Sequence, residues 1–222
     1  MSETARNIAI IGAGPAAIYG AGKLAGAGHH VVIFNRDIKP GGLAEYGIYP
    51  NKYRMKNGLR KMFGRILGDP KIRYMGNVTV GEGADVTLEE VWGLGFDAVV
   101  VAVGAQGTKW LGLPGEEAEA VYHAKDLVYH YNHLPPFSQQ EFQIGQDVAV
   151  VGFGNVALDI VHWLVNDRQI RSVTVVARRG PDERACTKKE LKIVSGAIDL
   201  EQLRQEFEAI RPALEALDQD VE

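Results

Sequence analysis

Two glycine-rich stretches of the chain have residue types and spacing suited to binding nucleotide phosphates. The first runs from Gly12 to Ala17 and the second from Gly152 to Ala157, and both have the pattern Gly-x-Gly-x-x-Ala. Glycines at these places allow a sharp turn and let backbone N–H groups approach a pyrophosphate at a helix N-terminus. We interpret both stretches as dinucleotide-binding turns; the alternative is a simple tight turn in an α/β protein.

Charged residues distinguish the second stretch. Arg178 and Arg179 follow the apolar run 173–177, at the place where NAD-specific folds put a carboxylate. Guanidinium groups there suit a ribose 2′-phosphate, so NADP is favoured over NAD. The alternative is a solvated basic turn. Asn155, at the start of the next helix, either caps that helix or bonds the nucleotide.

The first stretch has a different residue at the corresponding position. Asn35 closes its second strand, where an acidic residue usually accepts both ribose hydroxyls. An asparagine can still hydrogen-bond a ribose, without charge assistance.

Each glycine turn lies between elements that would position it. Residues 8–11 form a short apolar strand, an alanine-rich helix runs to about Ala27, and residues 31–34 form the next strand. Residues 148–151, 155–166 and 173–177 repeat this strand–helix–strand order. The repeat predicts two related nucleotide folds.

The remaining residues predict further elements. Further strands are expected at 72–75, 77–80 and 97–103, and we expect the strand at 97–103 to rejoin the first sheet. Helices are expected at 54–67, 86–92, about 125–132 and 200–217. We expect Pro212 to interrupt the helix at 200–217.

Composition narrows the classes of function. The chain has 222 residues, 46% of them hydrophobic, and a net charge of -4, which gives no global positive field for nucleic acid. Cys186 is the single cysteine, which excludes an internal disulfide, a Cys-x-x-Cys pair and a multi-cysteine metal site. No apolar run reaches membrane length, so we predict no membrane partner and a cytoplasmic location. His123, His130 and His133 are interpreted as surface or packing residues rather than metal ligands, and no metal is predicted.

Several motifs together resemble one family. They are the run 12–17, Gly41-Gly42-Leu43 followed by Tyr46-Gly47-Ile48, Lys56, the run 103–105, the run 154–159, the run 178–181 and the run 187–190. This set is similar to the flavin-dependent NADPH reductases of the adrenodoxin reductase (ferredoxin-NADP reductase) type, related to the glutamate synthase small subunit. The resemblance spans residues 7 to about 194 and includes both nucleotide units.

The resemblance implies two cofactors, FAD and NADP. For FAD it implies Gly12, Gly14, Gly42, Leu43 and Gly47; for NADP it implies Gly152, Gly154, Asn155, Arg178, Arg179 and Glu190. The predicted cofactor-binding set also includes Pro15, Ala16, Asn35, Val80, Gly104 and Val156. No catalytic side chain is predicted, because the cofactors carry the hydride chemistry.

The implied architecture is α/β with two Rossmann-like domains. We expect an FAD-binding domain at 1–105, a connector at 106–146, an NADP-binding domain at 147–199 and a polar C-terminal helix at 200–222. In the family, the chain returns after the NADP domain to complete the flavin site, and we expect that return segment to be missing here.

The implied function is an FAD-dependent oxidoreductase that takes hydride from NADPH and passes electrons to a ferredoxin-like iron–sulfur protein or a small acceptor. Two alternatives describe the chain as incomplete: a non-catalytic subunit whose partner completes the flavin site, or a fragment of a larger reductase. A third is an NADP dehydrogenase that uses the second unit alone.

Overall fold

Apolar β-branched runs form the strands of an α/β structure with parallel sheets. The computed structural model describes residues 4–105, 107–178, 180 and 183–216. Contacts between Cα atoms divide the chain into two units, Met1–Phe142 and Gln143–Glu222. Residues 107–142, most of the predicted connector, therefore group with the first unit.

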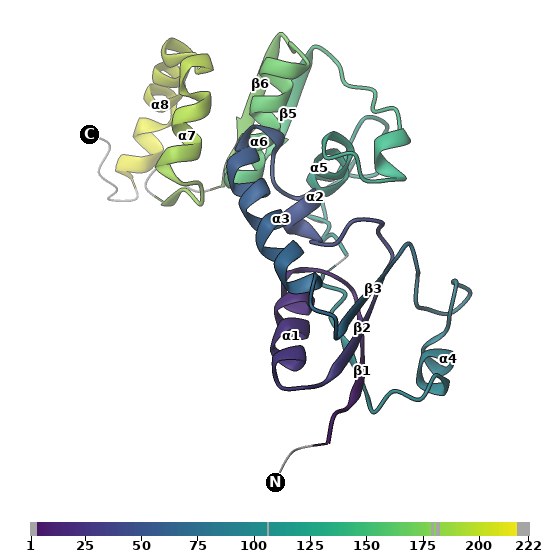
Figure 1. The fold of residues 1–222 in the computed structure, drawn as a ribbon. Helices are drawn as coiled ribbons and strands as arrows, with labels where there is room; N and C mark the ends of the chain where they lie inside the picture. The colour runs from purple at the N-terminus through teal and green to yellow at the C-terminus, as the bar shows by residue number, and fades with distance from the viewer. Residues whose placement is uncertain (1–3, 106, 179, 181–182, 217–222) are drawn as a thin grey trace. The chain divides into compact units, whose positions relative to one another are not determined.

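The first unit contains a four-stranded parallel sheet (Figure 1). Its strands are β1 (Asn7–Ile11), β2 (His30–Asn35), β3 (Ile72–Gly76) and β4 (Ala98–Val101), in the order β3-β2-β1-β4. The prediction that the strand near residue 100 rejoins the first sheet is confirmed, since Ile10 pairs with Ile33 on one side and Val100 on the other. The strand order reverses beside β1, the place where such sheets bind ligands.

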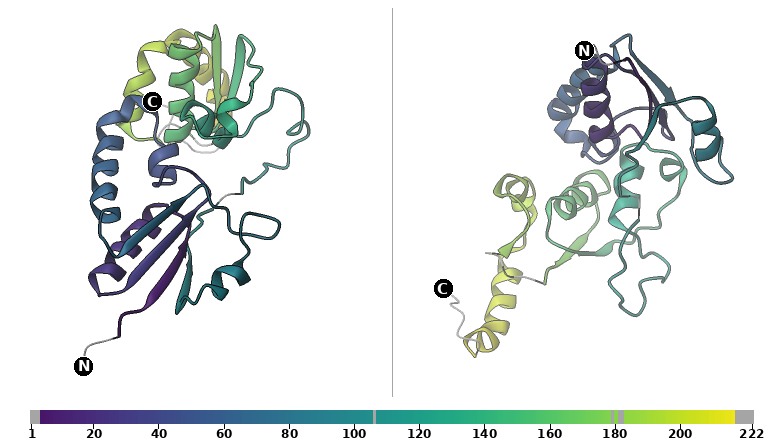
Figure 2. Two further views of the ribbon diagram at one scale, coloured as in Figure 1. Left: turned by 45° about the vertical axis from the view of Figure 1, so that its right-hand side comes forward. Right: turned by 90° about the horizontal axis from the view of Figure 1, so that it is seen from below.

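Two helices cover one face of this sheet, as the left view of Figure 2 shows. They are α1 (Pro15–Gly26) and α3 (Tyr53–Leu67). Alanines spaced four apart, Ala17, Ala21 and Ala25, are buried in one cluster with Ile10 and Ile33. Small side chains let α1 lie close to the strands, which holds its first turn against the end of β1.

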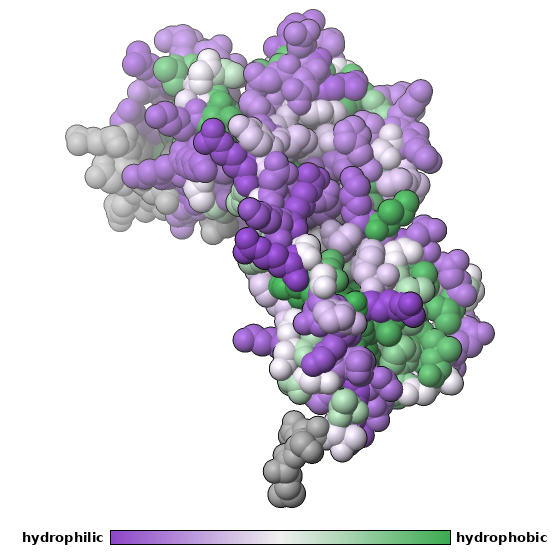
Figure 3. All heavy atoms as spheres, in the orientation of Figure 1, coloured by the Kyte–Doolittle hydropathy of each residue, from purple (hydrophilic) through white to green (hydrophobic). Residues whose placement is uncertain are grey.

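The other face is partly covered by α4 (Leu88–Gly93), whose Val91 is buried in a cluster with Ala9 and Phe34. Apolar residues gather on this side of the unit (Figure 3). The predicted strand at 77–80 is wrong: Asn77 has a positive φ of 58°, and Val80 forms only an isolated bridge to Val86. A left-handed residue interrupts the extended backbone that a strand requires.

Short helices complete the first unit. They are α2 (Leu43–Tyr46), α5 (Ala124–Tyr131) and the 3₁₀ turns at Pro50–Lys52 and Phe137–Gln139.

The second unit repeats the strand–helix–strand order. β5 (Asp147–Val151) pairs in parallel with β6 (Ser172–Val176), and α6 (Asn155–His162) continues as a π-helical turn at Trp163–Asp167. Two helices follow, α7 (Lys188–Val194) and α8 (Leu200–Glu215), with a 3₁₀ turn at Ser195–Ala197 between them.

The expected interruption at Pro212 is wrong, since α8 continues through it. The proline is exposed, and α8 passes through it with one helical hydrogen bond fewer, because proline has no N–H to donate to the residue four positions earlier. Within the described parts of the chain, no helix has the length and apolar character needed to cross a membrane.

Candidate functional site

The first glycine turn joins the end of β1 to α1. Gly12 has a φ of +99°, and a Cβ on it would lie 2.4 Å from the carbonyl oxygen of Ala102, just beyond β4. Any other residue would clash with backbone there and would also be strained, so glycine is required. A Cβ on Gly14 would meet nothing within 4 Å, so open space lies directly beside this part of the turn.

The loop that carries the predicted flavin residues lies on this turn. Gly41 N–H donates to the Ala13 carbonyl oxygen at 2.7 Å, and a Cβ on Gly42 would lie 3.1 Å from the Gly14 Cα. Gly42 has a φ of +51°, which favours glycine. The structure therefore brings together two predicted segments that are about 30 positions apart in the sequence.

The other predicted residues of this loop also have defined places. Leu43 begins α2 and leaves 61% of its surface exposed. Gly47 ends α2, and a Cβ there would lie 2.7 Å from the Leu43 carbonyl oxygen. Gly104 follows β4 with a φ of +72°, two residues after the Ala102 that contacts the turn. Val80 forms the isolated bridge to Val86 and packs against the cluster of Ala9, Phe34 and Val91.

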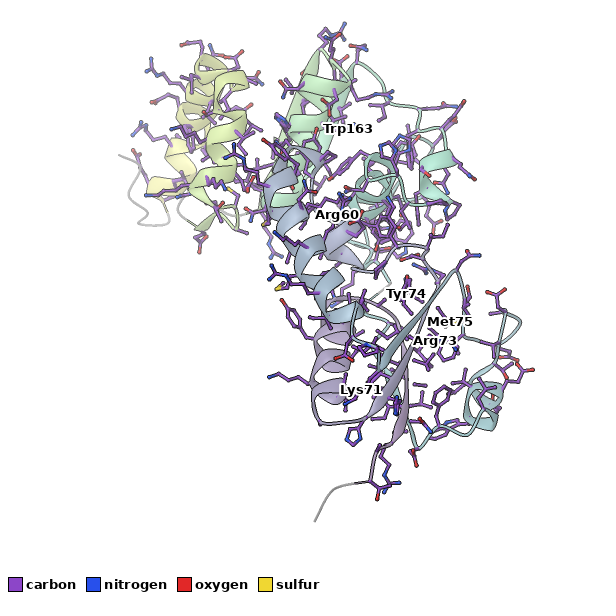
Figure 4. The ribbon with its side chains drawn as sticks, viewed as in Figure 1. Arg60, Lys71, Arg73, Tyr74, Met75 and Trp163 are labelled. Atoms are coloured by element: carbon purple, nitrogen blue, oxygen red, sulfur yellow. The ribbon has the colours of Figure 1, made fainter. Side chains whose placement is uncertain are left out.

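Asn35 ends β2 and is buried, with 8% of its surface exposed. Its Oδ1 accepts from the Ala13 N–H at 3.1 Å, and its Nδ2 donates to the Asp37 carbonyl oxygen at 2.7 Å and to Tyr74 Oη at 3.0 Å. Figure 4 shows Tyr74 on β3. Both amide hydrogens are used within the protein, so towards a ribose Asn35 could act only as an acceptor.

An ion pair between a buried glutamate and a half-exposed arginine supports the same loop from α3. Glu45 on α2 accepts two hydrogen bonds from Arg60, at 2.7 and 2.6 Å, and is 5% exposed. Arg60 is labelled on α3 in Figure 4. The hydrogen bonds from Arg60 lower the pKa of the Glu45 carboxyl, and its burial opposes them only in part.

Lys56 lies near this pair and is also buried. Its Nζ donates to Asn132 Oδ1 at 2.8 Å, and burial lowers its pKa. Sequence reasoning singled out Lys56 but missed Glu45, Arg60 and Asn132. These side chains are far apart in the sequence, and a single sequence carries no helical or strand periodicity that would reveal their pairing.

The second glycine turn has the same form. Gly152 has a φ of +121° and its N–H donates to the Val176 carbonyl oxygen at 2.8 Å, while Gly154 precedes α6. A Cβ on either glycine would meet nothing within 4 Å. Val156, in the first turn of α6, is 49% exposed. This turn also leaves open space beside its backbone.

Neither helix that follows a glycine turn has a side-chain cap. α1 and α6 also lack an acidic residue in their first turns. Side-chain caps are present on α4, α7 and α8, from Thr87, Thr187 and Asp199, whereas α2, α3 and α5 also have none. The N-terminal N–H groups of α1 and α6 are therefore suited to an anion.

Asn155 does not cap α6. Its Oδ1 accepts instead from the Thr187 N–H at 2.8 Å, and Thr187 caps α7 by accepting from the Glu190 N–H at 3.3 Å. The glycine turn and the predicted Glu190 are thus connected within the second unit. Sequence reasoning quoted Thr187 as part of a motif but gave it no role.

The predicted basic pair follows β6. Arg178 is exposed, two residues beyond Val176, the register partner of Val151 at the end of β5. Arg179 lies outside the described residues. Arg178 therefore stands at the same edge of the sheet as the second glycine turn.

Two of the three histidines have ring contacts in the first unit, and the third, His133, is exposed. The His123 ring contacts Trp110, with ring centroids 4.5 Å apart, and the His130 ring contacts Phe142 at 5.0 Å. His133 has a positive φ of 60°. Among the described residues, no group of three His, Cys, Asp or Glu side chains is arranged to hold a metal ion.

A family model fits most of the chain. Residues 6–192 match the family described as pyridine nucleotide-disulphide oxidoreductase. The chain belongs to this family. Its α/β fold with a parallel sheet, as predicted, is the fold of related solved structures.

The chain is similar in sequence to two reductases. It is 32% identical over 231 residues to the mitochondrial NADPH:adrenodoxin oxidoreductase of Arabidopsis thaliana, covering 93% of this chain and 47% of that protein. It is 34% identical over 213 residues to the NADPH-ferredoxin reductase FprA of Mycobacterium tuberculosis, covering 83% of this chain and 46% of that protein. The predicted resemblance to reductases of the adrenodoxin reductase type is confirmed.

The chain is also similar to a solved structure of FprA. Mycobacterium tuberculosis FprA in complex with NADPH is similar with a TM-score of 0.77 and 33% identity, covering 88% of this chain and 48% of that one. The chain thus spans about half the length of the relatives it matches.

Proposed function

We propose that this chain binds FAD at the Gly12 turn and NADP(H) at the Gly152 turn, and that it takes part in electron transfer from NADPH. The observation that carries the proposal is the pair of glycine turns, each with open space beside its backbone and each followed by an uncapped helix. In this proposal the two units are two Rossmann-like domains.

The residues present fit both cofactors. A pyrophosphate beside Gly14 or Gly154 would meet backbone N–H groups and no side chain, and the helix dipole favours its charge. The structure of FprA in complex with NADPH, similar to this chain at 33% identity, supports a nicotinamide nucleotide as one ligand.

For FAD we propose the residues of the first turn and of the loop that contacts it. They are Gly12, Gly14, Pro15, Ala16, Gly42, Leu43 and Gly47, with Asn35 beside them; we add Val80, in the bridge to Val86, and Gly104, which follows β4. The exposed Leu43 would lie along the flavin. The Glu45–Arg60 pair would hold α2, and with it this loop, in place.

For NADP(H) we propose Gly152, Gly154, Asn155 and Val156 at the turn, with Arg178, Arg179 and Glu190. Arg178 is an exposed cation at the end of β6, where a 2′-phosphate would be read.

FAD, when bound, supplies the chemistry, because a flavin accepts the electrons of a hydride and can release them singly. The protein binds and orients the two nucleotides, and no side chain acts as a nucleophile. We propose an iron–sulfur protein or a small molecule as the acceptor, as the names of NADPH-ferredoxin reductase and NADPH:adrenodoxin oxidoreductase suggest. The cytoplasmic location stays a prediction.

A second candidate function is a partner-dependent subunit, or a portion of a larger reductase, whose flavin site is completed by residues outside this chain. One observation favours it: β4 is an edge strand of the first sheet, and its Val101 is 64% exposed. A further strand could pair there.

Calorimetric titration of the purified chain with FAD and then with NADPH tests the proposal. We expect one FAD and one NADPH per chain. NADPH binding without FAD binding would instead favour the second candidate or a dehydrogenase that uses the second unit alone.

A further inference from the structure

Asn35 occupies the position where a dinucleotide-binding fold places its ribose-reading residue, yet its side chain is directed to the protein. Its two amide hydrogens go to the Asp37 carbonyl oxygen and Tyr74 Oη, and its oxygen accepts from the Ala13 N–H at 3.1 Å. With 8% of its surface exposed, the residue makes these bonds where water cannot easily replace them.

Ala13 is held on both sides. Its N–H is bound to Asn35, and its carbonyl oxygen accepts from the Gly41 N–H at 2.7 Å. Ala13 is 2% exposed and lies between Gly12 and Gly14, so these bonds fix the two peptide groups at the centre of the first glycine turn.

Tyr74, which accepts a hydrogen bond from Asn35 Nδ2, is itself held in place. Tyr74 Oη lies 3.0 Å from the Asp37 carbonyl oxygen and 3.1 Å from that of Ile38, to which it donates. A Cβ on Gly76 would lie 2.8 Å from the Tyr74 ring, so glycine there makes room for the ring. Asn35 is thus oriented from behind by Tyr74 and the 37–38 backbone.

We propose that Asn35 is a positioning residue, which holds the Gly12–Gly14 turn in the shape that receives FAD by binding the Ala13 N–H. It does not replace the usual carboxylate as a charged reader of the ribose. This inference rests on the proposed FAD site. We therefore expect that an acidic residue at position 35, the usual residue type there, weakens FAD binding instead of strengthening it.

The physical reason is the loss of donors. An ionised carboxylate introduced by Asn35→Asp has no hydrogen to donate, and it would face the Asp37 carbonyl oxygen, now 2.7 Å from Nδ2. A ribose reader would behave in the opposite way, because a carboxylate bonds ribose hydroxyls more strongly than an amide does.

FAD dissociation constants of the full chain, measured by flavin fluorescence between pH 5 and pH 8, test the proposal. We expect Asn35→Asp to raise the FAD dissociation constant about tenfold or more at pH 8, because one to two buried hydrogen bonds are lost. The loss should shrink as the pH falls, since protonation of the introduced carboxyl restores one donor. Tyr74→Phe, which removes only the hydroxyl group, should weaken FAD about fivefold without that pH dependence.

Asn166 is exposed in the π-helical turn after α6, and its Nδ2 donates to the His162 carbonyl oxygen at 3.0 Å. Asn166→Asp is therefore the matched control and should leave FAD affinity unchanged. Tighter FAD binding by Asn35→Asp at pH 8, or unchanged binding by Tyr74→Phe, would overturn the proposal.

Hydrogen exchange of the Ala13 amide in the FAD-free chain gives an independent result. We expect it to be protected in the wild type and to exchange at least tenfold faster after Asn35→Ala. Rapid exchange in the wild type would overturn the positioning role even if FAD binds. Protection in a chain that does not bind FAD would support the contact while rejecting the proposed flavin function.

Discussion

Asn155 Oδ1 accepts a hydrogen bond from the Thr187 N–H at 2.8 Å, which joins the second glycine turn to the start of α7. Thr187 in turn caps that helix by accepting from the Glu190 N–H. The segment proposed to receive the NADP pyrophosphate and the segment that carries Glu190 are therefore held together before any nucleotide binds.

Loss of the hydrogen bond between Asn155 and the Thr187 N–H should weaken NADPH binding. We expect Asn155→Ala to raise the NADPH dissociation constant about fivefold, since one hydrogen bond contributes about 1 kcal/mol. Thr187→Ala, which removes the helix cap, should weaken NADPH by a smaller factor. Asn166→Ala is the control and should have no effect. An unchanged dissociation constant for Asn155→Ala, measured by calorimetry, would show that the bond from the Thr187 N–H to Asn155 does not support nucleotide binding.

Gly12→Ala should be severely destabilising. The new Cβ would lie 2.4 Å from the Ala102 carbonyl oxygen at a φ of +99°, so we expect the free energy of unfolding to fall by about 2–4 kcal/mol. Gly20→Ala is the matched control within α1: its Cβ would meet nothing within 4 Å, and helix propensity favours alanine by up to about 1 kcal/mol. Urea denaturation of both variants measures the difference. Equal stability would contradict the close approach of Gly12 to the Ala102 carbonyl oxygen.

The Glu45–Arg60 pair should make stability depend on acid pH. Folding lowers the pKa of the Glu45 carboxyl below its ordinary 4.5, so the pair stabilises the protein above that pH and loses its effect as the pH falls through the folded-state pKa. Glu45→Gln should lower the free energy of unfolding at pH 7 by about 1–3 kcal/mol and flatten its dependence below pH 4.5.

Glu208→Gln provides the comparison for this pair. Glu208 bonds Arg211 on the exposed surface of α8, where an ion pair contributes little. We expect no measurable change in its urea midpoint at pH 7. A similar loss in both variants would show that burial of Glu45 is unimportant.

The double variant Arg178→Ala with Arg179→Ala should separate NADPH from NADH. Loss of the guanidinium groups should weaken NADPH by about tenfold to a hundredfold, the range of one or two charge-assisted hydrogen bonds, and leave NADH nearly unchanged. Parallel titrations with both nucleotides measure this. Equal weakening would show that the pair does not read the 2′-phosphate.

The local framework of the fold could be predicted from the sequence. Apolar β-branched runs that end at a glycine turn have a pattern that strand and turn chemistry determine locally, and β1 and β5 are confirmed before Gly12 and Gly152. The strands predicted after each helix are confirmed as β2 and β6. Positive φ at Gly12 and Gly152 also agrees with the turn that the glycine spacing predicts.

Contacts between distant side chains could not be predicted. Asn35 was interpreted as a weak substitute for an acid, because the sequence does not reveal that Tyr74 and Ala13 use its amide. The roles open for Asn155 were a cap or a nucleotide ligand, and its bond to Thr187 was not among them. A single sequence gives the period of each element but not which side chains meet when elements pack.

Anaerobic mixing of the FAD-loaded chain with NADPH tests the central claim most directly. Hydride transfer to the flavin bleaches its visible absorbance, and we predict full bleaching with one equivalent of NADPH and much slower bleaching with the same concentration of NADH. A chain that binds both nucleotides but keeps its flavin absorbance after NADPH addition would contradict the proposed electron transfer.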